Sequence, residues 1–448
     1  MIGEGNVLQS SINNIAVNAQ YRMKYHMIPA VGWMNDPNGL IFYGGKYHLF
    51  YQSNPYDTAM GTMFWGHFVS DDLISYRDVG VAIAPDNEGE SIYSGGSTVF
   101  EGDLVALYTL HYEKDGIKSE QVHAARSSDG MTFKKCGRVF DNCSLPPEIS
   151  REDFRDPCPA KVGDEYFVFV GGRDITKNAG VIIVLGGKSP FELDYRFTIG
   201  PLYELGDMGE CPSYCRIDGK DVIVASGCNV PQRGNDFKNL NSSVFIVGRI
   251  DFEKGAMDIE SVREIDKGDS FYAPQFIANA DRPIMVGWLE MWGKRYLTHE
   301  LNHGWSGSFT IPREVSVKNG VIYQTPVKAL EKYLSPAGRP SSCLDIDMEL
   351  GIGDVVIIAG DNCSVMIGND CRVYLDTSHA NNLNGCTRYT NGRYEHCRVR
   401  VLLDVSGIEL FIDGGKETIS SRIFLDGQYS VITRGKAGII NINEIKVK

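Results

Sequence analysis

Several kinds of segment are absent from this 448-residue sequence, and each absence excludes a class of protein. No run of Lys and Arg occurs and the net charge is −13, so the sequence lacks the basic face of a nucleic-acid-binding protein. The same charge makes anionic membranes poor partners. No apolar run approaches the roughly 20 residues of a membrane span. The polar segment 1–20 has no basic stretch followed by an apolar core, which predicts that no signal peptide is present.

Paired cysteines are absent as well. The 11 cysteines are scattered, with no Cys-x-x-Cys pair and no His–Cys cluster at zinc spacing. The sequence therefore predicts neither a disulfide framework nor a bound metal, and we expect no cofactor. Free thiols and the missing signal peptide together indicate a cytoplasmic protein.

Long helical periods are few, whereas glycine is abundant at 49 residues and aromatic residues make up 10%. This composition favours an all-β fold rich in turns. Short strand–turn–strand units recur along the first 300 residues, each with a turn of Gly, Asp or Asn between two apolar runs. These five predicted hairpins join residues 40–43 to 46–51, 97–100 to 104–108, 159–162 to 165–170, 213–217 to 222–225, and 275–277 to 283–288.

One polar or acidic residue precedes each hairpin, and these residues follow one another at intervals of 54 to 62 positions. They are Asp36, Ser94, Asp156, Glu210 and Asp269. A period of this size with hairpins at a constant phase predicts a five-bladed β-propeller, in which these five residues would meet at one end of the central channel. The alternative is five unrelated turn residues, since Asp and Ser are common before strands.

The pattern changes after Pro312, where short alternating runs separated by Gly and Asp turns indicate a β-sandwich. The domain organisation that we expect is an N-terminal extension over 1–20, the propeller over 21–325, a linker over 326–340 and the sandwich over 341–448. We also expect Arg313 and Glu314 to form a structural ion pair near the domain junction.

Three carboxylates stand in settings that suit chemistry. Asp36 lies in the tight turn 32–39, Asp156 follows Arg155, and Glu210 precedes Cys211. Converging carboxylates without metal-ligand histidines suit glycoside hydrolysis, in which one acts as nucleophile or base and one as general acid. The acid has to keep its proton near neutral pH. Each residue also has a structural interpretation, as a turn cap, an ion pair or a strand end.

Ordered motifs across residues 21–448 match one family. They are Trp33-Met34-Asn35-Asp36-Pro37-Asn38-Gly39; Tyr51-Gln52-Ser53-Asn54-Pro55; Trp65-Gly66-His67; Tyr93-Ser94-Gly95; Phe154-Arg155-Asp156-Pro157; Glu210-Cys211-Pro212; the segments 266–275 and 304–314; and the C-terminal run 401–424. The sequence resembles glycoside hydrolase family 32, the invertases, fructanases and sucrose-6-phosphate hydrolases.

The resemblance implies a five-bladed propeller with a sandwich and a retaining β-fructosidase that cleaves a terminal β-D-fructofuranosyl bond of sucrose, sucrose-6-phosphate or short fructo-oligosaccharides. It implies that Asp36 is the nucleophile that forms a fructosyl-enzyme intermediate, Glu210 the general acid and base, and Asp156 the transition-state stabiliser. Arg155 would orient the carboxylates. The further residues expected at the substrate are Asn35, Gln52, Trp33, Trp65, Tyr93, Ser94, Tyr272 and Trp288.

Four positions depart from the family pattern: Met60, Cys158, Gly209 and Ser213, where Trp, Lys, an aromatic residue and Asp are usual. We expect them to alter the leaving-group side of the pocket. Two other functions stay open: a fructosyltransferase of the same family, and a catalytically silent fructan-binding propeller. The only partner expected is a small fructoside, and the sequence does not indicate an oligomeric state.

Overall fold

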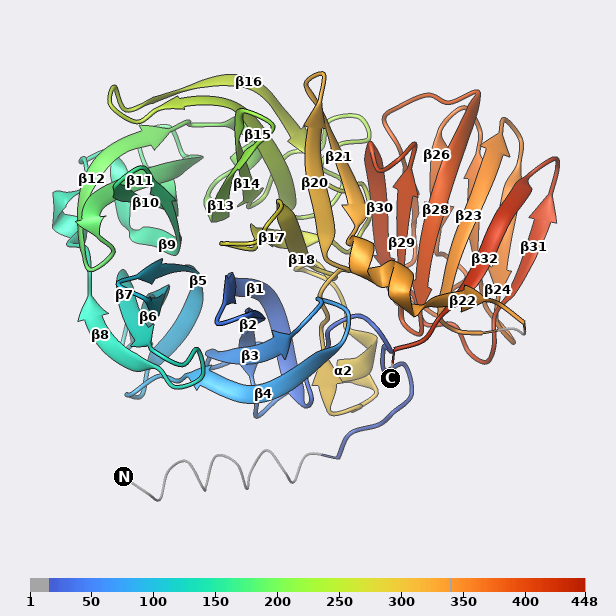
Figure 1. Ribbon diagram of the computed structural model, residues 1–448, viewed down its shortest axis with the longest axis horizontal. Helices are drawn as coiled ribbons and strands as arrows, with labels where there is room; N and C mark the ends of the chain where they lie inside the picture. The colour runs from blue at the N-terminus through green and yellow to red at the C-terminus, as the bar shows by residue number, and fades with distance from the viewer. Residues whose placement is uncertain (1–15, 339–340, 448) are drawn as a thin grey trace.

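The computed structural model describes residues 16–338 and 341–447 and consists almost wholly of β-strands, which confirms the all-β prediction (Figure 1). Residues 1–15, most of the expected N-terminal extension, lie outside the described residues. The helical segments that are described are short: η1 (Asn142–Ser144), η2 (Tyr203–Leu205), α2 (Leu297–Glu300) and η3 (Lys328–Tyr333). None of the described helices is long and apolar enough to cross a membrane.

Residues 32–326 form five sheets. The first contains β1 (Gly32–Tyr43), β2 (Lys46–Asn54), β3 (Phe64–Ser70) and β4 (Tyr76–Ile83), with β19 (Trp305–Ser306) parallel to β1. The second contains β5 (Glu90–Phe100), β6 (Asp103–Lys114), β7 (Ile117–Ser127) and β8 (Lys134–Arg138). The third contains β9 (Ile149–Val162), β10 (Glu165–Asp174), β11 (Ala179–Ser189) and β12 (Glu192–Ile199). The fourth contains β13 (Gly209–Ile217), β14 (Lys220–Gly227), β15 (Ser242–Asp251) and β16 (Ala256–Glu264). The fifth contains β17 (Tyr272–Phe276), β18 (Ile284–Trp288), β20 (Arg313–Lys318) and β21 (Val321–Pro326).

The five sheets stand around a common centre (Figure 1). All five predicted hairpins are confirmed, since they are the pairs β1–β2, β5–β6, β9–β10, β13–β14 and β17–β18. Strands β1, β5, β9, β13 and β17 contact one another in this order, and β17 contacts β1 again. These five inner strands therefore close a ring. Apolar clusters fill the space between neighbouring sheets, for example Val105 with Val168 and Ile223 with Ile182.

Each inner strand carries a β-bulge at a corresponding position of its ladder with the second strand. In all five ladders one extra residue of the inner strand opposes the second strand. The bulged residues are Asn35 and Asp36, Ser94, Asp156 and Pro157, Cys211 and Pro212, and Ala273 and Pro274. Proline suits a bulge because it has no N–H to give to the ladder. The backbone of Asp156 and of Cys211 is left-handed, with φ of 64° and 46°. A bulge re-aims side chains, and here it turns residues from separate sheets toward one end of the ring.

The C-terminal part contains two further sheets, drawn in orange and red in Figure 1. One consists of β22 (Leu334–Pro336), β32 (Gly438–Ile445), β23 (Leu344–Gly351), β28 (His396–Asp404), β29 (Gly407–Ile412) and β30 (Glu417–Arg422). The other consists of β27 (Thr387–Tyr389), β26 (Val373–Asp376), β25 (Ser364–Asn369), β24 (Val355–Ala359) and β31 (Ser430–Arg434). A single apolar core lies between them, with Ile346 and Val399 from one sheet and Ile358 and Ile367 from the other. Within the segment expected as a linker, β22 pairs with β32 and so extends the first of these sheets.

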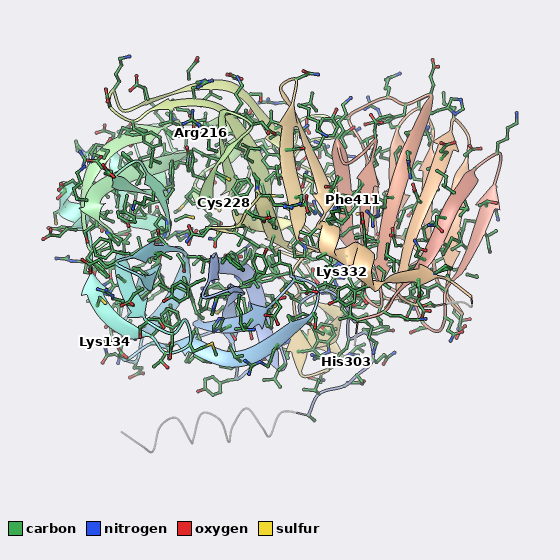
Figure 2. The ribbon with its side chains drawn as sticks, in the orientation of Figure 1. Lys134, Arg216, Cys228, His303, Lys332 and Phe411 are labelled. Atoms are coloured by element: carbon green, nitrogen blue, oxygen red, sulfur yellow. The ribbon has the colours of Figure 1, made fainter. Side chains whose placement is uncertain are left out.

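Buried charges join the two parts of the chain. Arg313 is fully buried and pairs with Asp266 of the ring region and Glu409 of β29. The predicted pair between Arg313 and Glu314 is wrong, because neighbouring strand residues point to opposite faces and Glu314 pairs instead with Arg282 on the surface. The apolar part of the junction includes Phe411 of β29 (Figure 2).

Candidate active site

A pocket of about 370 Å³ opens where the bulged segments meet, near the N-terminal ends of the inner strands. We call it the carboxylate pocket. Its walls are formed by Asn35, Asp36, Gln52, Met60, Tyr93, Ser94, His111, Glu113, Lys118, Glu120, Arg155, Asp156, Glu210, Asn241 and Trp292. Four of the five polar or acidic residues that precede the predicted hairpins thus lie together: Asp36, Ser94, Asp156 and Glu210.

Asp36 is 8% exposed on the bulge of β1. Ser94 donates a 2.9 Å hydrogen bond to its Oδ2 atom, while no hydrogen bond to its Oδ1 atom is found among the described residues. Burial raises the pKa of Asp36 to about 6, and the negative charge of Glu210 adds to the rise. The Oδ1 atom of Asp36 is therefore a buried carboxylate oxygen without a hydrogen-bond donor among the described residues.

Asp156 is held by the backbone of the next sheet. The N–H of Cys211 donates a 2.9 Å hydrogen bond to its Oδ2 atom. Burial raises the pKa of Asp156 to about 7, with contributions from Glu210 and Asp36, although Arg155 acts in the opposite direction. The Cys211 thiol lies 3.4 Å from Asp156 Oδ2 and 3.6 Å from Asp36 Oδ2, so one sulfur atom contacts both carboxyl groups.

Glu210 is surrounded by donors. Arg155 donates to its Oε1 atom from Nε at 3.1 Å and from Nη2 at 2.6 Å, and the Tyr272 hydroxyl donates to Oε2 at 2.6 Å. Burial acts to raise the pKa of Glu210, but the charge of Arg155 and the hydrogen bonds from Tyr272 and Arg155 together outweigh it, and the pKa is lowered. The expectation that Glu210 itself keeps a proton near neutral pH is wrong for the ligand-free structure. With a pKa of about 7, Asp156 is the carboxyl group of this cluster that shares a proton near neutral pH, whereas Asp36, with a pKa of about 6, is mainly ionised there.

The structure brings most of the other predicted substrate residues to this place. Asn35, Gln52, Tyr93, Ser94 and Arg155 line the carboxylate pocket. Two more stand directly behind its wall. Trp33 donates a 2.7 Å hydrogen bond from Nε1 to Asn35 Oδ1, and Tyr272 reaches the pocket through its bond to Glu210.

Neither Trp65 nor Trp288 lines the carboxylate pocket, and both side chains are fully buried. Trp65 packs on Phe50 and donates a 3.0 Å hydrogen bond to the carbonyl oxygen of Tyr93. Trp288 packs edge-on against Trp33 at 5.8 Å between ring centroids. Both therefore support residues of the pocket wall from behind.

Asp269 is a further correction. It precedes β17 by three residues, faces the C-terminal part, and bonds to Lys294 and Ser421. In the fifth sheet, the position equivalent to that of the other four residues is held by Tyr272 and Ala273, which lie at the start of the bulge of β17.

The four departures from the family pattern do not gather on one side. Met60 lines the carboxylate pocket and is 48% exposed. Cys158 and Ser213 instead line a second pocket of about 550 Å³, further along the inner strands, where the thiol lies 3.5 Å from the Ser213 hydroxyl. Gly209 lies against the third sheet, where a Cβ atom would come within 2.6 Å of the Val181 carbonyl oxygen. Of the four positions, only Met60 lines the carboxylate pocket.

Several lining residues escaped the sequence reasoning. They are His111, Glu113, Lys118, Glu120, Asn241 and Trp292. Four of them come from β6 and β7, whose turn brings distant polar positions together, and His111 is the direct ladder partner of Glu120. Alternation of polar residues along these strands was the only signal available. Within residues 16–338 and 341–447 no group of three or more His, Cys, Asp and Glu side chains is arranged to hold a metal ion.

Comparison with known proteins assigns the family. Residues 26–326 match the model of the glycosyl hydrolases family 32 N-terminal domain, and residues 368–447 match that of the family's C-terminal region. This chain belongs to glycosyl hydrolases family 32.

Other members of the family match over nearly the whole chain. A sucrose-6-phosphate hydrolase of Vibrio alginolyticus is 31% identical, covering 92% of this chain and 88% of its own. A raffinose invertase of Escherichia coli is 29% identical, covering 89% of both chains. Among solved structures, a family 32 β-fructofuranosidase of Bombyx mori in complex with sucrose is 27% identical, with a TM-score of 0.85 over 99% of this chain and 98% of its own.

Proposed function

We propose that this protein is a retaining β-fructosidase that hydrolyses the terminal β-D-fructofuranosyl bond of sucrose, sucrose-6-phosphate or a short fructo-oligosaccharide. The observation that carries the proposal is the convergence of Asp36, Asp156 and Glu210 in one pocket of about 370 Å³. The names of the relatives support it, since they describe sucrose-6-phosphate hydrolases, a raffinose invertase and a β-fructofuranosidase bound to sucrose.

In the proposed reaction Asp36 is the nucleophile. Its carboxylate attacks the anomeric carbon of the fructosyl unit and forms a fructosyl-enzyme ester. The attack needs Asp36 ionised. The Ser94 hydroxyl favours the ionised form, because it donates to one oxygen of this carboxylate.

Glu210 is the proposed general acid. It protonates the glycosidic oxygen as the bond breaks, then accepts a proton from the water that hydrolyses the ester. Asp156 would accept hydrogen bonds from fructose hydroxyls and stabilise the positive charge that develops on the ring. Asn35, Gln52, Tyr93 and Ser94 are the proposed remaining contacts to the sugar.

We further propose that the five sheets are the blades of a five-bladed β-propeller over 21–325, that 326–340 links it to the second part, and that 341–448 is a β-sandwich. The ring of inner strands and the two sheets around one core support this division. We propose that the protein acts in the cytoplasm, which agrees with the 11 free cysteines.

A panel of sucrose, sucrose-6-phosphate, kestose, inulin and levan, with released fructose measured, tests the proposal. We expect fructose from at least one of these fructosides, and we expect Asp36→Asn to abolish its release. Absence of fructose from every fructoside would favour the fructan-binding propeller. Product analysis in concentrated sucrose separates a hydrolase from a fructosyltransferase, because transfer yields new oligosaccharides.

A further inference from the structure

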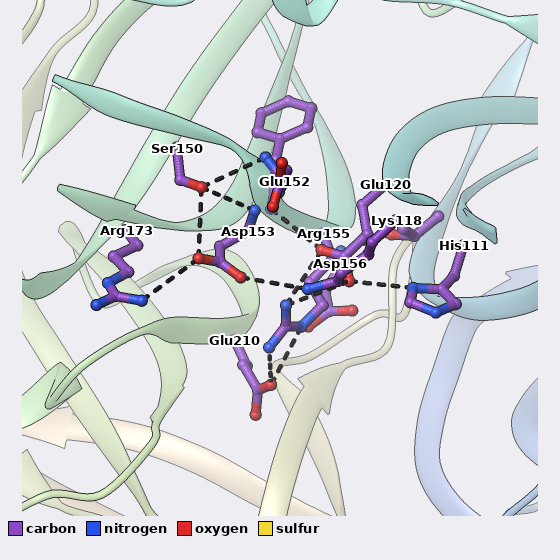
Figure 3. A network of polar contacts seen from close by, with 12 residues as sticks. His111, Lys118, Glu120, Ser150, Glu152, Asp153, Arg155, Asp156, Arg173 and Glu210 are labelled. Carbon is purple, nitrogen blue, oxygen red and sulfur yellow. Dashed lines mark hydrogen bonds and ion pairs between the residues drawn. The ribbon is translucent and has the colours of Figure 1, made fainter. Parts of the chain in front are cut away.

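Arg155 binds two carboxylates at once. Its Nη2 and Nε atoms bind Glu210, while Nη1 donates a 3.1 Å hydrogen bond to Oε2 of Glu120 (Figure 3). Glu120 belongs to β7, and its side chain is 1% exposed. One guanidinium therefore stands between a buried carboxylate of the second sheet and the carboxylate proposed as general acid.

Glu120 is fixed as an anion. His111 Nδ1 lies 3.2 Å from its Oε1 atom, the Phe154 N–H donates to Oε2 at 3.2 Å, and Lys118 Nζ lies 3.7 Å from Oε1. Burial acts to raise the pKa of Glu120, but its hydrogen bond with His111 and the charge of Arg155 lower that pKa to about 2. Glu120 therefore carries its charge at every pH at which a glycosidase of this kind would work.

Other charged and titratable groups surround this pair. The groups that act directly on Glu120 or Arg155 are Tyr93 of β5, His111 of β6, Lys118 of β7, Asp156 of β9 and Glu210 of β13. Glu113 pairs in turn with His111, and Asp153 with Lys118. Arg173 of β10 pairs with Asp153 and stands one position further out (Figure 3). Glu120 is the only one of these carboxylates that bonds to Arg155 from the side away from Glu210.

We propose that Glu120 is a positioning residue of the reaction. Because Arg155 pairs with Glu120 as well as with Glu210, Glu120 sets how readily Glu210 takes up the proton needed by the leaving group. The proposal rests on the proposed function of Glu210 as general acid. It assigns to Glu120 no contact with the reacting atoms, since its effect passes through Arg155.

The sign of the effect follows from the charges. In the wild type the anionic Glu120 offsets part of the positive charge of Arg155, so Glu210 is less strongly held in its ionised form. Without that anion, Arg155 stabilises ionised Glu210 and Asp156 more strongly, and both lose their protons at lower pH. The alkaline limb of kcat/KM against pH reports loss of the proton from the free enzyme's essential acid. It therefore moves to lower pH when Glu120 loses its charge.

The test is the pH profile of kcat/KM for Glu120→Gln, Glu120→Asp and the wild type on the best fructoside of the panel. Gln keeps the shape of the side chain and removes the charge, so its alkaline limb is expected at least about half a pH unit lower. Asp keeps the charge but places it one methylene further from Arg155, so the alkaline limb is expected to shift in the same direction by a smaller amount. Glu101→Gln is the matched control, because Glu101 is exposed, forms an ion pair with Arg126 and does not line the carboxylate pocket.

A Glu120→Gln profile that superimposes on the wild type, even at reduced rate, overturns the proposal and leaves Glu120 a structural residue. If Glu120→Gln does not fold, as judged by its melting transition, the decision passes to Glu120→Asp, and an unshifted or upward-shifted limb overturns the proposal. A wild type that releases no fructose at any pH refutes the proposed function itself, which is a different outcome.

Discussion

Arg155 binds a single oxygen of Glu210 through two N–H groups, Nε at 3.1 Å and Nη2 at 2.6 Å. Tyr272 binds the other oxygen. A carboxylate with this many donors is stabilised as an anion, yet a general acid has to carry a proton. Asp156 stands beside it with a pKa raised to about 7. In the proposed reaction Glu210 therefore has to take up a proton that the charge of Arg155 disfavours in this structure.

Replacing Glu210 by Gln tests this role with substrates of different leaving groups. We expect kcat/KM for sucrose to fall by about 10³-fold, within the usual range for loss of a general acid. Fructosyl fluoride, whose leaving group needs little proton transfer, is expected to lose much less. Steady-state rates on both substrates provide the measurement. Asp36→Asn is the matched comparison, because loss of the nucleophile impairs both substrates, and equal losses in Glu210→Gln would contradict the assignment.

Tyr272→Phe is expected to move the pH profile in the direction opposite to Glu120→Gln. The hydroxyl donates to Glu210 Oε2 and so favours the ionised form. Its removal raises the pKa of Glu210, and the alkaline limb of kcat/KM moves to higher pH. The aromatic ring stays in place, so packing against its neighbours is retained. A limb that moves to lower pH would show that Tyr272 does not act through Glu210.

The repeat predicted much of this architecture, since hairpins at a constant phase placed the inner strands of all five sheets and the three carboxylates. It failed at Asp269 because the bulges, rather than the distance to the hairpin, determine which residue faces the centre. Pro37, Pro157, Pro212 and Pro274 mark four of the five bulges in the sequence. Aligning the repeats on these prolines would have selected Ala273 in place of Asp269, but it would also have selected Cys211 in place of its neighbour Glu210.

Contacts between distant strands were beyond the reach of sequence reasoning. Glu120 is one polar residue among several in β7, and only the ring geometry brings it to Arg155. Likewise nothing in the sequence distinguishes Trp65, which lies behind the pocket wall, from Trp292, which lines it. A residue type reports what a side chain can do, and the fold decides whether it reaches the pocket.

Cys158→Ser and Ser213→Ala test the separation of the two pockets. Both residues line the second pocket, so neither substitution alters the walls of the carboxylate pocket. We expect kcat/KM on the best fructoside to change by less than about threefold, which corresponds to a small change in activation free energy. Met60→Ala is the contrasting variant, because Met60 lines the carboxylate pocket. A large loss in Cys158→Ser with an unchanged melting temperature would show that the second pocket influences the first.

His26 provides a test of the junction between the two parts of the chain. It is fully buried, with Nδ1 at 2.9 Å from Asp404 and Nε2 at 2.9 Å from Glu409. Burial alone would lower the pKa of His26, but the two carboxylates raise it to about 9. Compared with about 6.5 in the unfolded chain, this rise is equivalent to roughly 3 kcal/mol of stability.

Because the folded pKa is raised, this stabilisation is fully present below about pH 6.5 and is lost as the pH rises through about 9. We therefore expect His26→Gln to lower the melting temperature markedly at pH 6. The difference in melting temperature between this variant and the wild type should be smaller at pH 9.5. His123→Gln is the control, since burial lowers the pKa of His123 to about 4 and that residue is neutral at both pH values. A gap that stays constant for His26→Gln would mean that the imidazole is uncharged in the folded protein and contributes through packing alone.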